Sequence, residues 1–515
     1  MKTDVEQVHP DLERFRSELT KALGFRIEDD KLPWLADLLH ERVRTTHQRD
    51  NQTYLDQIGG NHQEISHLAL ELSVTETYFM RNYNHFLAFT DLIQNKSRIP
   101  PKKKLRILSA GCSSGEEPYS LAITILEGLK DSAQWEISIT AVDINRDVIE
   151  KAIKGRYSNW SFRETSDTLK ERHFHKDGKL FVINDELKKM VTFEQGNLVS
   201  PQLNIWQLES FDIVFCRNVL MYFTLDAARE IVHRITHSLV PGGHLFLGHA
   251  ESLRGLSREF HLLHTHGTFY YQRRTSREEL KPADDSREFV STFRPVEREP
   301  VSIDTTQPSW PEVIAGASNR IDLLATTAAS ERSKAAESRD AESPAPVENG
   351  SHLEPALDLL KRERFLEALS LLTAIPASLP DPDTLLLRAV LHISSGDISS
   401  AETVCEELLT VDELNAGAYY VMALCKESGG DHKGAMENHQ IAAYLDSEFA
   451  LPHLHLGLIA RREKGFETAR RELSLAIGLL AREDASRIVL FGGGFGREAL
   501  IELCQSELRA CGGTP

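Results

Sequence analysis

The run LRILSAGCSSGEEPYS, residues 105–120, decides the fold class that we expect for the chain. An apolar strand leads into a loop of small residues, and a helix follows with Pro118 near its first turn. Gly111 and Gly115 permit backbone conformations and a close approach of a ligand that a Cβ would block. Because their spacing is not G-x-G-x-x-G, the loop disfavours a dinucleotide and predicts another nucleotide-type ligand.

Two acidic residues stand at the end of this loop. Glu116 and Glu117 suit a cationic ligand, since a carboxylate can pair with an ammonium or lie near a sulfonium. S-adenosylmethionine carries both groups and has no pyrophosphate to be held. Acids at a helix start are favourable without any ligand, so this pair alone leaves a purely structural explanation open.

Polar side chains also end three later strands. Asp143 closes ISITAVDI, Asn197 and Leu198 follow MVTFEQ, and Arg217 and Asn218 close FDIVFCRN. Open α/β sheets bind ligands at the carboxyl ends of their strands, where an acid on the second strand can accept both ribose hydroxyls. An amide after the third strand could read adenine. Together with the loop, this order indicates a site for S-adenosylmethionine.

The chain is expected to be multidomain. Helical periodicity predicts an N-terminal all-α domain, and strands that alternate with helices then predict a Rossmann-like α/β domain with a mostly parallel sheet. A small β-subdomain interrupts it, with a hairpin turn at Asp177-Gly178. A segment rich in Ser, Glu, Ala and Pro reads as a flexible linker. The expected ranges are 1–92 for the helical domain, 93–274 for the α/β domain, 156–190 for the β-subdomain and 275–350 for the linker.

A repeat follows the linker. Thr384–Gly417, Ala418–Leu451 and Pro452–Ala485 are three consecutive blocks of 34 residues, the period of tetratricopeptide repeats. Small residues share one register in each helix of the pair and predict close packing: Ala389, Ala423 and Gly457, then Ala401, Ala435 and Ala469. We expect repeats over 351–485, including a degenerate fourth at about 352–383, and a capping helix over 486–515.

Composition excludes several classes of protein. A net charge of −18 argues against a nucleic-acid partner, which needs a basic surface. No apolar run reaches the ~18 residues of a membrane span. The polar, acidic N-terminus does not resemble a signal peptide, so we expect a cytoplasmic protein with six reduced cysteines.

The histidines and cysteines do not form a recognisable metal-binding motif. The cysteines form no C-x-x-C pair, and the histidines of HLLHTH (261–266) lack the helical spacing or acidic partners of a known metal motif. The sequence therefore predicts no metal.

The chain resembles the CheR family of chemoreceptor glutamate methyltransferases over about residues 8–274. The resemblance rests on TETYFMRN (75–82), AGCSSGEEPYS (110–120), AVDIN (141–145), GNL (196–198) and FCRNVLMYF (215–223). It implies S-adenosylmethionine as cofactor, S-adenosylhomocysteine as product, and a linker, TETYFMRN, that closes over the cofactor. The implied cofactor-binding residues are Thr75, Thr77, Arg81, Glu117, Asp143, Asn197, Leu198, Arg217 and Asn218.

This sequence departs from the family pattern at two positions. Thr75 stands where Asn is frequent, which puts its direct cofactor contact in question, although a hydroxyl can still donate or accept. Met80 stands where a second Phe is usual. Tyr222 matches a family tyrosine close to the transferred methyl group.

The implied reaction is methyl transfer to glutamate side chains of a methyl-accepting chemoreceptor. A glutamate is already ionised at neutral pH, so the enzyme mainly has to position it; Arg81 and Tyr222 are the expected catalytic residues. The N-terminal helices would dock on the receptor's cytoplasmic domain, at membrane-anchored receptor clusters. The basic candidates for this contact are Lys31, Arg42, Arg44 and Arg49, and the alternative is an ordinary solvated helix face.

Two further expectations concern the accessory parts. The short hairpin at Asp177-Gly178 favours a member that does not need a receptor's C-terminal peptide. CheR proteins fused to tetratricopeptide repeats resemble the methyltransferases of surface-sensing systems, which feed cyclic-di-GMP signalling and biofilm control, and the repeats would bind an unknown protein partner. The alternative is a scaffold in which the repeats function and the methyltransferase fold is a relic.

Overall fold

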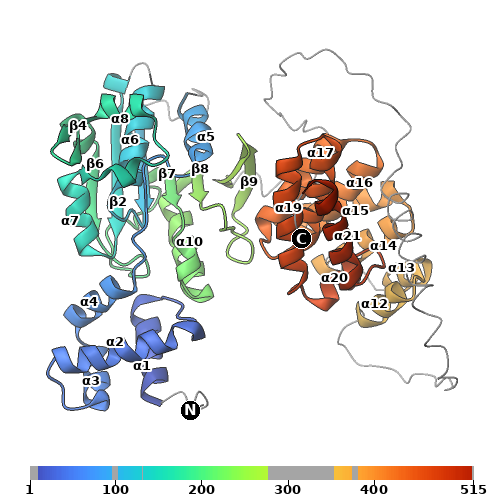
Figure 1. The fold of residues 1–515 in the computed structure, drawn as a ribbon, viewed down its shortest axis with the longest axis horizontal. Coiled ribbons are helices and arrows are strands. Elements are labelled where there is room, and N and C mark those ends of the chain that lie inside the picture. Colours follow the sequence, from blue (N-terminus) through green and yellow to red (C-terminus); the bar gives the residue numbers. More distant parts are fainter. Residues whose placement is uncertain (1–9, 95–102, 130–131, 276–352, 374–380, 513–515) are drawn as a thin grey trace. The chain divides into compact units, whose positions relative to one another are not determined.

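The structure is a computed structural model that describes residues 10–94, 103–129, 132–275, 353–373 and 381–512 (Figure 1). The chain divides into two compact units, Met1–Lys281 and Pro282–Pro515. Apart from Thr275, the linker expected over 275–350 lies outside the described residues. Among the described residues, no helix is long and apolar enough to cross a membrane.

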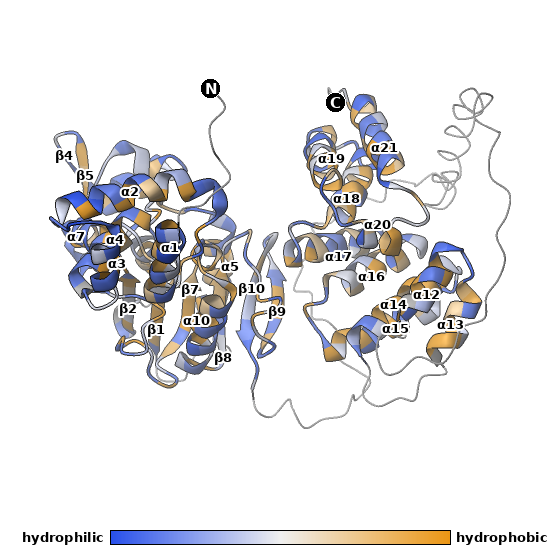
Figure 2. Ribbon diagram, turned by 90° about the horizontal axis from the view of Figure 1, so that it is seen from below, coloured by the Kyte–Doolittle hydropathy of each residue, from blue (hydrophilic) through white to orange (hydrophobic). Residues whose placement is uncertain are grey.

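A seven-stranded sheet forms the centre of the first unit, in the order β6-β2-β1-β7-β8-β10-β9. β1 pairs in parallel with β2 and β7, β2 with β6, and β7 with β8, while β10 runs antiparallel to both neighbours. The strands are β1 Lys104–Ala110, β2 Glu136–Asp143, β6 Val191–Gln195, β7 Phe211–Cys216, β8 Leu239–Leu247, β9 Phe260–Thr265 and β10 Thr268–Arg273. This is the expected Rossmann-like sheet, and its central strand β7 is buried along its whole length (Figure 2).

Helices cover this sheet because each has one apolar face. α5 packs against α6 and β10, α7 against β2 and β6, and α10 against β8. Their bounds are α5 Tyr83–Gln94, α6 Glu116–Gly128, α7 Arg146–Lys154 and α10 Leu225–Ser238. The expected helical domain of residues 1–92 includes most of α5, but Phe86 of α5 stacks on Phe215 of the sheet and Phe89 meets the same ring edge-on. The apolar face of α5 therefore belongs to the core of the α/β domain.

Four other helices form a separate N-terminal core. They are α1 Pro10–Leu23, α2 Leu32–Thr45, α3 Asn51–Ile58 and α4 His62–Leu72, with a 3-10 turn at Asp29–Lys31. Phe15, Leu19, Leu35 and Leu55 are buried between them. This core meets the α/β domain at Ile144, which packs against it.

A three-stranded antiparallel sheet, β3-β5-β4, confirms the expected β-subdomain. Its elements are β3 Arg156–Tyr157, η3 Asn159–Phe162, α8 Asp167–His173, β4 Phe174–Asp177, β5 Leu180–Ile183 and α9 Asp185–Lys188. Gly178 turns the β4–β5 hairpin at a φ of 62°, a conformation that favours glycine. Phe79 stacks on Phe162 and meets Phe174 edge-on, so the TETYFMRN segment is anchored in this subdomain.

The second unit consists of helix pairs, as the 34-residue period predicts (Figure 1). The first pair is α12 Leu353–Lys361 and α13 Phe365–Thr373. Three regular pairs follow: α14 Pro382–Ser394 with α15 Ile398–Val411, α16 Ala416–Ser428 with α17 His432–Leu445, and α18 Ala450–Arg462 with α19 Phe466–Leu480. The predicted small residues are buried where paired helices meet; a Cβ on Gly457 would lie 2.7 Å from Leu473 Cγ.

Two helices follow the repeats where one capping helix was expected. α21 (Arg497–Ala510) packs on α19, as a cap would. α20 (Ala485–Phe491) instead lies against α12 and α14. The Phe491 ring at its end contacts Tyr420 and Phe449, with centroid distances of 5.4 and 5.1 Å. Part of the surface formed by the first helices of the pairs is therefore covered by the chain's own α20.

Candidate active site

A cavity opens at the carboxyl ends of β1, β2, β6 and β7 and encloses about 940 Å³, part of it open to solvent. It brings together nine of the ten predicted site residues: Thr77, Arg81, Glu117, Asp143, Asn197, Leu198, Arg217, Asn218 and Tyr222. Thr75 is the exception. Its side chain is exposed and does not line the cavity, while its backbone oxygen accepts a hydrogen bond from Ser113 Oγ at 2.8 Å.

The glycines of the loop after β1 let it fold tightly over the strand ends. Gly111 has a φ of 78°, and a Cβ there would lie 2.3 Å from Val219 Cγ2. Gly115 has a φ of 90°, and a Cβ there would lie 2.8 Å from the Cβ of Ala152. A side chain at Gly111 would push the loop away from Val219 in the segment after β7, and one at Gly115 would push it away from α7, so both glycines let the loop pack closely.

The two loop glutamates have different roles. Glu116 is 3% exposed and accepts hydrogen bonds from Ser114 Oγ at 2.7 Å and Ser161 Oγ at 3.1 Å, so it joins the loop to the β-subdomain. Glu117 faces the cavity, where Ser109 Oγ donates to it at 2.7 Å. Burial raises the pKa of Glu117, while the Arg217 guanidinium 3.4 Å away opposes that shift. Of the pair, only Glu117 can meet a ligand in the cavity.

Asp143 at the end of β2 is held by backbone amides. Its carboxylate accepts from Ser113 N at 2.8 Å and from Asn145 N at 2.9 Å. Burial raises its pKa, and these amide donors counteract the rise. The geometry fixes the carboxylate in the cavity wall, where the remaining lone pairs can accept from a ligand hydroxyl.

Arg217 is buried behind the cavity. It donates to Asn82 Oδ1 at 2.9 Å and to the backbone oxygen of Arg81, and it lies over the Phe86 ring. Burial lowers its pKa, and the nearby Glu117 opposes this. Its buried Nε makes no hydrogen bond to any part of the chain that the structure describes. One donor of the site therefore stays available for a bound group.

Glu251 is a functional candidate that the sequence reasoning missed. Its carboxylate is 5% exposed and accepts from four backbone amides, those of Asn218 (2.6 Å), Val219 (2.8 Å), Met221 (3.2 Å) and Gly248 (2.7 Å). Asn218 has a φ of 57°, a left-handed conformation that needs such support. The acid in GHAESL, directly after β8, was the available signal.

The segment before α5 forms the opposite wall. Two hydrogen bonds hold this segment in place. Ser113 Oγ donates to the backbone oxygen of Thr75 at 2.8 Å, and Asn145 Nδ2 donates to Ser73 Oγ at 2.7 Å. Met80 has a φ of 59°, is 3% exposed, and its backbone amide donates a hydrogen bond to Ser120 Oγ at 3.0 Å. Arg81 lies 5.7 Å from the Tyr78 ring centroid and lines the cavity. The predicted linker is thus part of the site.

The N-terminal helices complete the cavity from the other side. Phe25 lines it and meets Phe223 with a centroid distance of 5.2 Å. The amide of Arg26 donates to the backbone oxygen of Tyr222 at 2.8 Å. Asn197 Nδ2 donates to the backbone oxygen of Ala22 at 3.4 Å. Sequence patterns within one domain could not reveal these contacts between domains.

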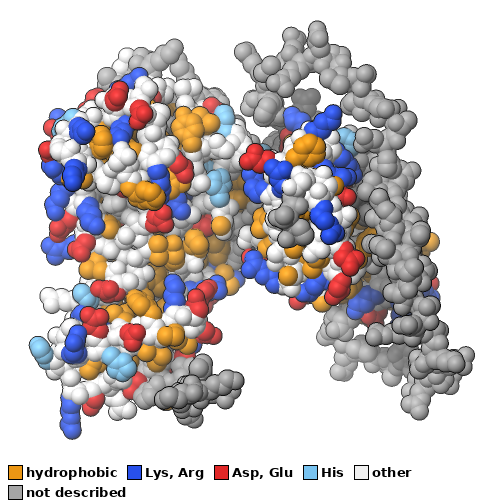
Figure 3. Space-filling view, viewed as in Figure 1, with side chains coloured by type: hydrophobic (Ala, Val, Ile, Leu, Met, Phe, Trp, Pro, Cys, Tyr) orange, Lys and Arg blue, Asp and Glu red, His pale blue; other side chains and the backbone are white. Residues whose placement is uncertain are grey.

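One of the four basic docking candidates is used inside the domain. Arg42 forms a bidentate pair with Glu64 at 2.8 and 2.7 Å, and only 14% of its side chain is exposed. It holds α2 on α4 and is therefore not free for a partner, which corrects the expectation for this residue. Acidic and basic side chains alternate over the face of the first unit seen in Figure 3.

The strand order, together with an acid-lined cavity at the strand ends, defines a Rossmann-like S-adenosylmethionine-dependent methyltransferase. The residues fit this cofactor: half-buried Glu117 and Asp143 suit its cationic groups and ribose hydroxyls, and Arg217 Nε is an unused donor.

Similarity to known proteins supports the assignment to the methyltransferases. Residues 75–269 match the CheR methyltransferase SAM-binding domain. Chemotaxis protein methyltransferase 2 of Vibrio cholerae is 33% identical over 255 residues, 48% of this chain and 88% of the relative. The probable biofilm formation methyltransferase WspC of Pseudomonas aeruginosa is 25% identical over 463 residues, 89% of this chain and 96% of that protein. The chain belongs to the CheR family, the protein-glutamate O-methyltransferases.

Several solved structures are similar to the helical repeats. PcrH from Pseudomonas aeruginosa covers 26% of this chain and 96% of its own, with 18% identity and a TM-score of 0.23. A match at this level carries no argument about function, and the helix pairs themselves define the repeat fold.

Proposed function

We propose that this methyltransferase forms methyl esters on glutamate side chains of a methyl-accepting, chemoreceptor-like protein. The proposal rests on one cavity whose wall carries two half-buried carboxylates, Glu117 and Asp143, together with the partly exposed Arg81 and Tyr222. The carboxylates suit a cationic cofactor, and the exposed pair suits an anionic substrate that enters from solvent.

The cofactor-binding residues follow from their places in the cavity. Glu117 would meet the cationic part of S-adenosylmethionine, Asp143 the ribose hydroxyls, and Asn197 with Leu198 the adenine. Arg217, Asn218, Thr77 and Arg81 would complete the binding site. Thr75 would act through its backbone oxygen, which holds Ser113 in place, and not through its side chain. When bound, S-adenosylmethionine supplies the activated methyl group.

The chain's own residues then have to position the substrate. A glutamate side chain is ionised at neutral pH and needs no general base. Arg81 would pair with the incoming carboxylate and Tyr222 would donate a hydrogen bond to it, since burial raises the pKa of the Tyr222 hydroxyl and keeps it protonated. The main contribution of the protein is therefore orientation and exclusion of water.

The accessory parts would choose the substrate. Lys31, Arg44 and Arg49 remain as basic residues with which the N-terminal helices could dock on an acidic receptor segment. The similarity to WspC over 89% of the chain favours a receptor of a surface-sensing system that acts on biofilm formation. The helical repeats would bind a further protein of that signalling complex.

A methyl-transfer assay tests this function. The full chain is incubated with methyl-labelled S-adenosylmethionine and the purified cytoplasmic domain of a receptor encoded near its gene. Label that appears on the receptor domain and leaves it under mild base supports a glutamate methyl ester. Calorimetry with S-adenosylhomocysteine separates the alternative, because a relic fold that serves only as a scaffold would not bind it.

A further inference from the structure

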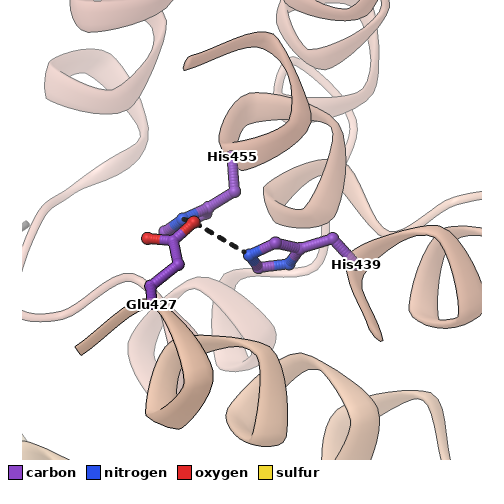
Figure 4. Close-up of side chains that lie close together, drawn as sticks. All are labelled: Glu427, His439 and His455. Carbon is purple, nitrogen blue, oxygen red and sulfur yellow. Dashed lines mark ion pairs between the residues drawn. The ribbon is translucent and has the colours of Figure 1, made fainter. Parts of the chain in front are cut away.

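Three titratable side chains meet inside the helical repeats, far from the cavity in sequence (Figure 4). Glu427 comes from α16, His439 from α17 and His455 from α18, so each belongs to a different helix. Glu427 Oε1 lies 3.4 Å from His439 Nε2 and 3.5 Å from His455 Nδ1. The three side chains are between 0% and 4% exposed. A carboxylate is thus buried between two imidazoles.

Both contacts are ion pairs, but they are long for direct hydrogen bonds. A charge-assisted N–H···O bond is about 2.7–2.9 Å, so the two imidazoles hold the buried carboxylate only loosely. Around a tetrahedral Zn²⁺ with bonds near 2.0–2.1 Å, neighbouring ligand atoms lie about 3.4 Å apart. Both Glu–His separations match that edge. The three ligand atoms all lie within 4.8 Å of one another, so small side-chain rotations complete the convergence.

The surroundings orient the ligand nitrogens. Tyr420, which is 2% exposed, places its hydroxyl 3.2 Å from His455 Nε2 and 3.4 Å from the backbone oxygen of Phe491. If the hydroxyl donates to Phe491, His455 Nε2–H donates to the hydroxyl, and Nδ1 turns its lone pair toward Glu427. Metal-binding histidines use their second nitrogen in this way. Neither ring nitrogen of His439 forms a hydrogen bond to any described residue.

We propose that Glu427, His439 and His455 bind one Zn²⁺ ion that joins the second and third regular helix pairs of the repeats. Two imidazoles and a carboxylate form a neutral-plus-anionic ligand set that zinc favours. The ligand side chains are buried and lie outside the methyltransferase unit, so the ion would stabilise the repeats, and the three protein ligands leave the fourth tetrahedral position to a water molecule. Among the described residues, this is the one group of three or more histidine, cysteine or acidic side chains whose ligand atoms lie close enough together to hold a metal ion.

This proposal departs from the expectation that the chain has no metal. Known metal motifs often place their ligands at short spacing on one helix, whereas these three side chains come from three separate helices. Only the packing of α16, α17 and α18 brings them together.

Metal analysis of the full chain tests the site. The protein is produced without a metal-affinity tag in medium with added zinc, and its zinc content is measured by inductively coupled plasma mass spectrometry after dialysis. About one zinc per chain is expected, and removal with a chelator should lower the melting temperature of the helical repeats by about 5–10 °C. Cobalt substitution should give the visible absorption of a tetrahedral site.

Matched variants locate the ion. Glu427→Gln and His439→Ala should each lose about nine-tenths of the bound zinc. The control is His453→Ala, on the same helix as His455, because His453 Nδ1 already lies at hydrogen-bond distance, 2.8 Å, from Glu472; it should keep the zinc. Should His439→Ala not fold, Glu427→Gln and the cobalt spectrum of the unmodified chain decide. No bound zinc or cobalt in the unmodified chain, or unchanged binding in Glu427→Gln, would overturn the proposal.

Discussion

Glu251 Oε2 accepts a hydrogen bond from the backbone amide of Asn218 at 2.6 Å, and through it β8 fixes the segment that follows β7. The same carboxylate holds Val219, whose side chain closes over Gly111 of the cofactor loop. Glu251 does not itself line the cofactor cavity, but it positions two segments of the cavity wall, the one after β7 and the loop after β1.

Replacing Glu251 should therefore lower methyl transfer, because the cavity wall at Asn218 and Val219 would lose its support. Glu251→Gln keeps the shape but turns an amide NH2 toward backbone donors, which should cost about 2–3 kcal/mol of stability and lower kcat/KM about 10- to 100-fold. Steady-state methyl transfer and urea unfolding measure both effects. Glu259→Gln, an exposed acid nearby, is the control. Wild-type kinetics in Glu251→Gln would show that the four hydrogen bonds do not position the site.

Removing the guanidinium of Arg81 should reduce methyl transfer strongly and leave the fold intact. Arg81 lines the cavity and its side chain bonds only weakly, to the backbone oxygen of Glu76 at 3.3 Å. We expect Arg81→Ala to lower kcat/KM about 100-fold, because a charge-assisted contact contributes about 1.5–3 kcal/mol. The exposed Arg146, which pairs with Glu150, gives the control variant Arg146→Ala. Full activity of Arg81→Ala would remove Arg81 from the catalytic residues.

The pH dependence of cofactor binding follows from the two half-buried acids. Burial raises the pKa of Glu117 and of Asp143 above ordinary values of 4.5 and 3.8. The folded cofactor-free protein holds these protons more tightly than the unfolded chain, so its stability falls as pH rises through the raised pKa values. A cationic cofactor favours the carboxylates and restores that stability.

The thermal stabilisation by S-adenosylmethionine should accordingly grow as pH rises above 4.5, the ordinary pKa of a glutamate, and through the raised pKa values of the two acids. Scanning calorimetry with and without the cofactor at a series of pH values measures it. Glu117→Gln should bind more weakly and show a flatter pH profile. An identical profile in wild type and variant would mean that Glu117 does not meet the cofactor.

The turn between the two helices of each regular pair contains one residue with a left-handed backbone conformation. Gly396 and Gly430 have φ values of 83° and 79°, and Lys464 holds the equivalent position in the next pair at 62°. A side chain in this conformation is strained, so Lys464→Gly should stabilise the repeats by about 0.5–1 kcal/mol, while Gly430→Ala should destabilise them by about 1 kcal/mol. Urea unfolding followed by circular dichroism compares the two. The same sign of change in both variants would contradict this reading of the turn.

The sequence could predict what depends on local pattern. The strand-end positions of Asp143 and Arg217 and the loop glycines identify the cavity because parallel strands end at one edge of the sheet. The 34-residue register places Ala423 and Gly457 correctly, since one period describes every helix pair.

What the sequence did not reveal depends on tertiary contacts. Helix α5 has an apolar face that suits either neighbouring domain, and only packing assigns it to the sheet. The acid in GHAESL was a weak signal for Glu251, whose role depends on backbone amides distant in sequence, and the cluster around Glu427 has no sequence signature because its members lie on different helices. The family resemblance implied that the Thr75 side chain contacts the cofactor. In this structure that side chain is exposed, and the Thr75 backbone oxygen accepts a hydrogen bond from Ser113 Oγ.

The central claim is that this cavity transfers methyl groups to receptor glutamates. Tandem mass spectrometry of the receptor's cytoplasmic domain, after incubation with the full chain and S-adenosylmethionine, tests it most directly. We expect methyl esters on defined glutamates, formed with the wild type and almost absent with Arg81→Ala. Methylation of other residue types, or equal methylation by both proteins, would contradict it.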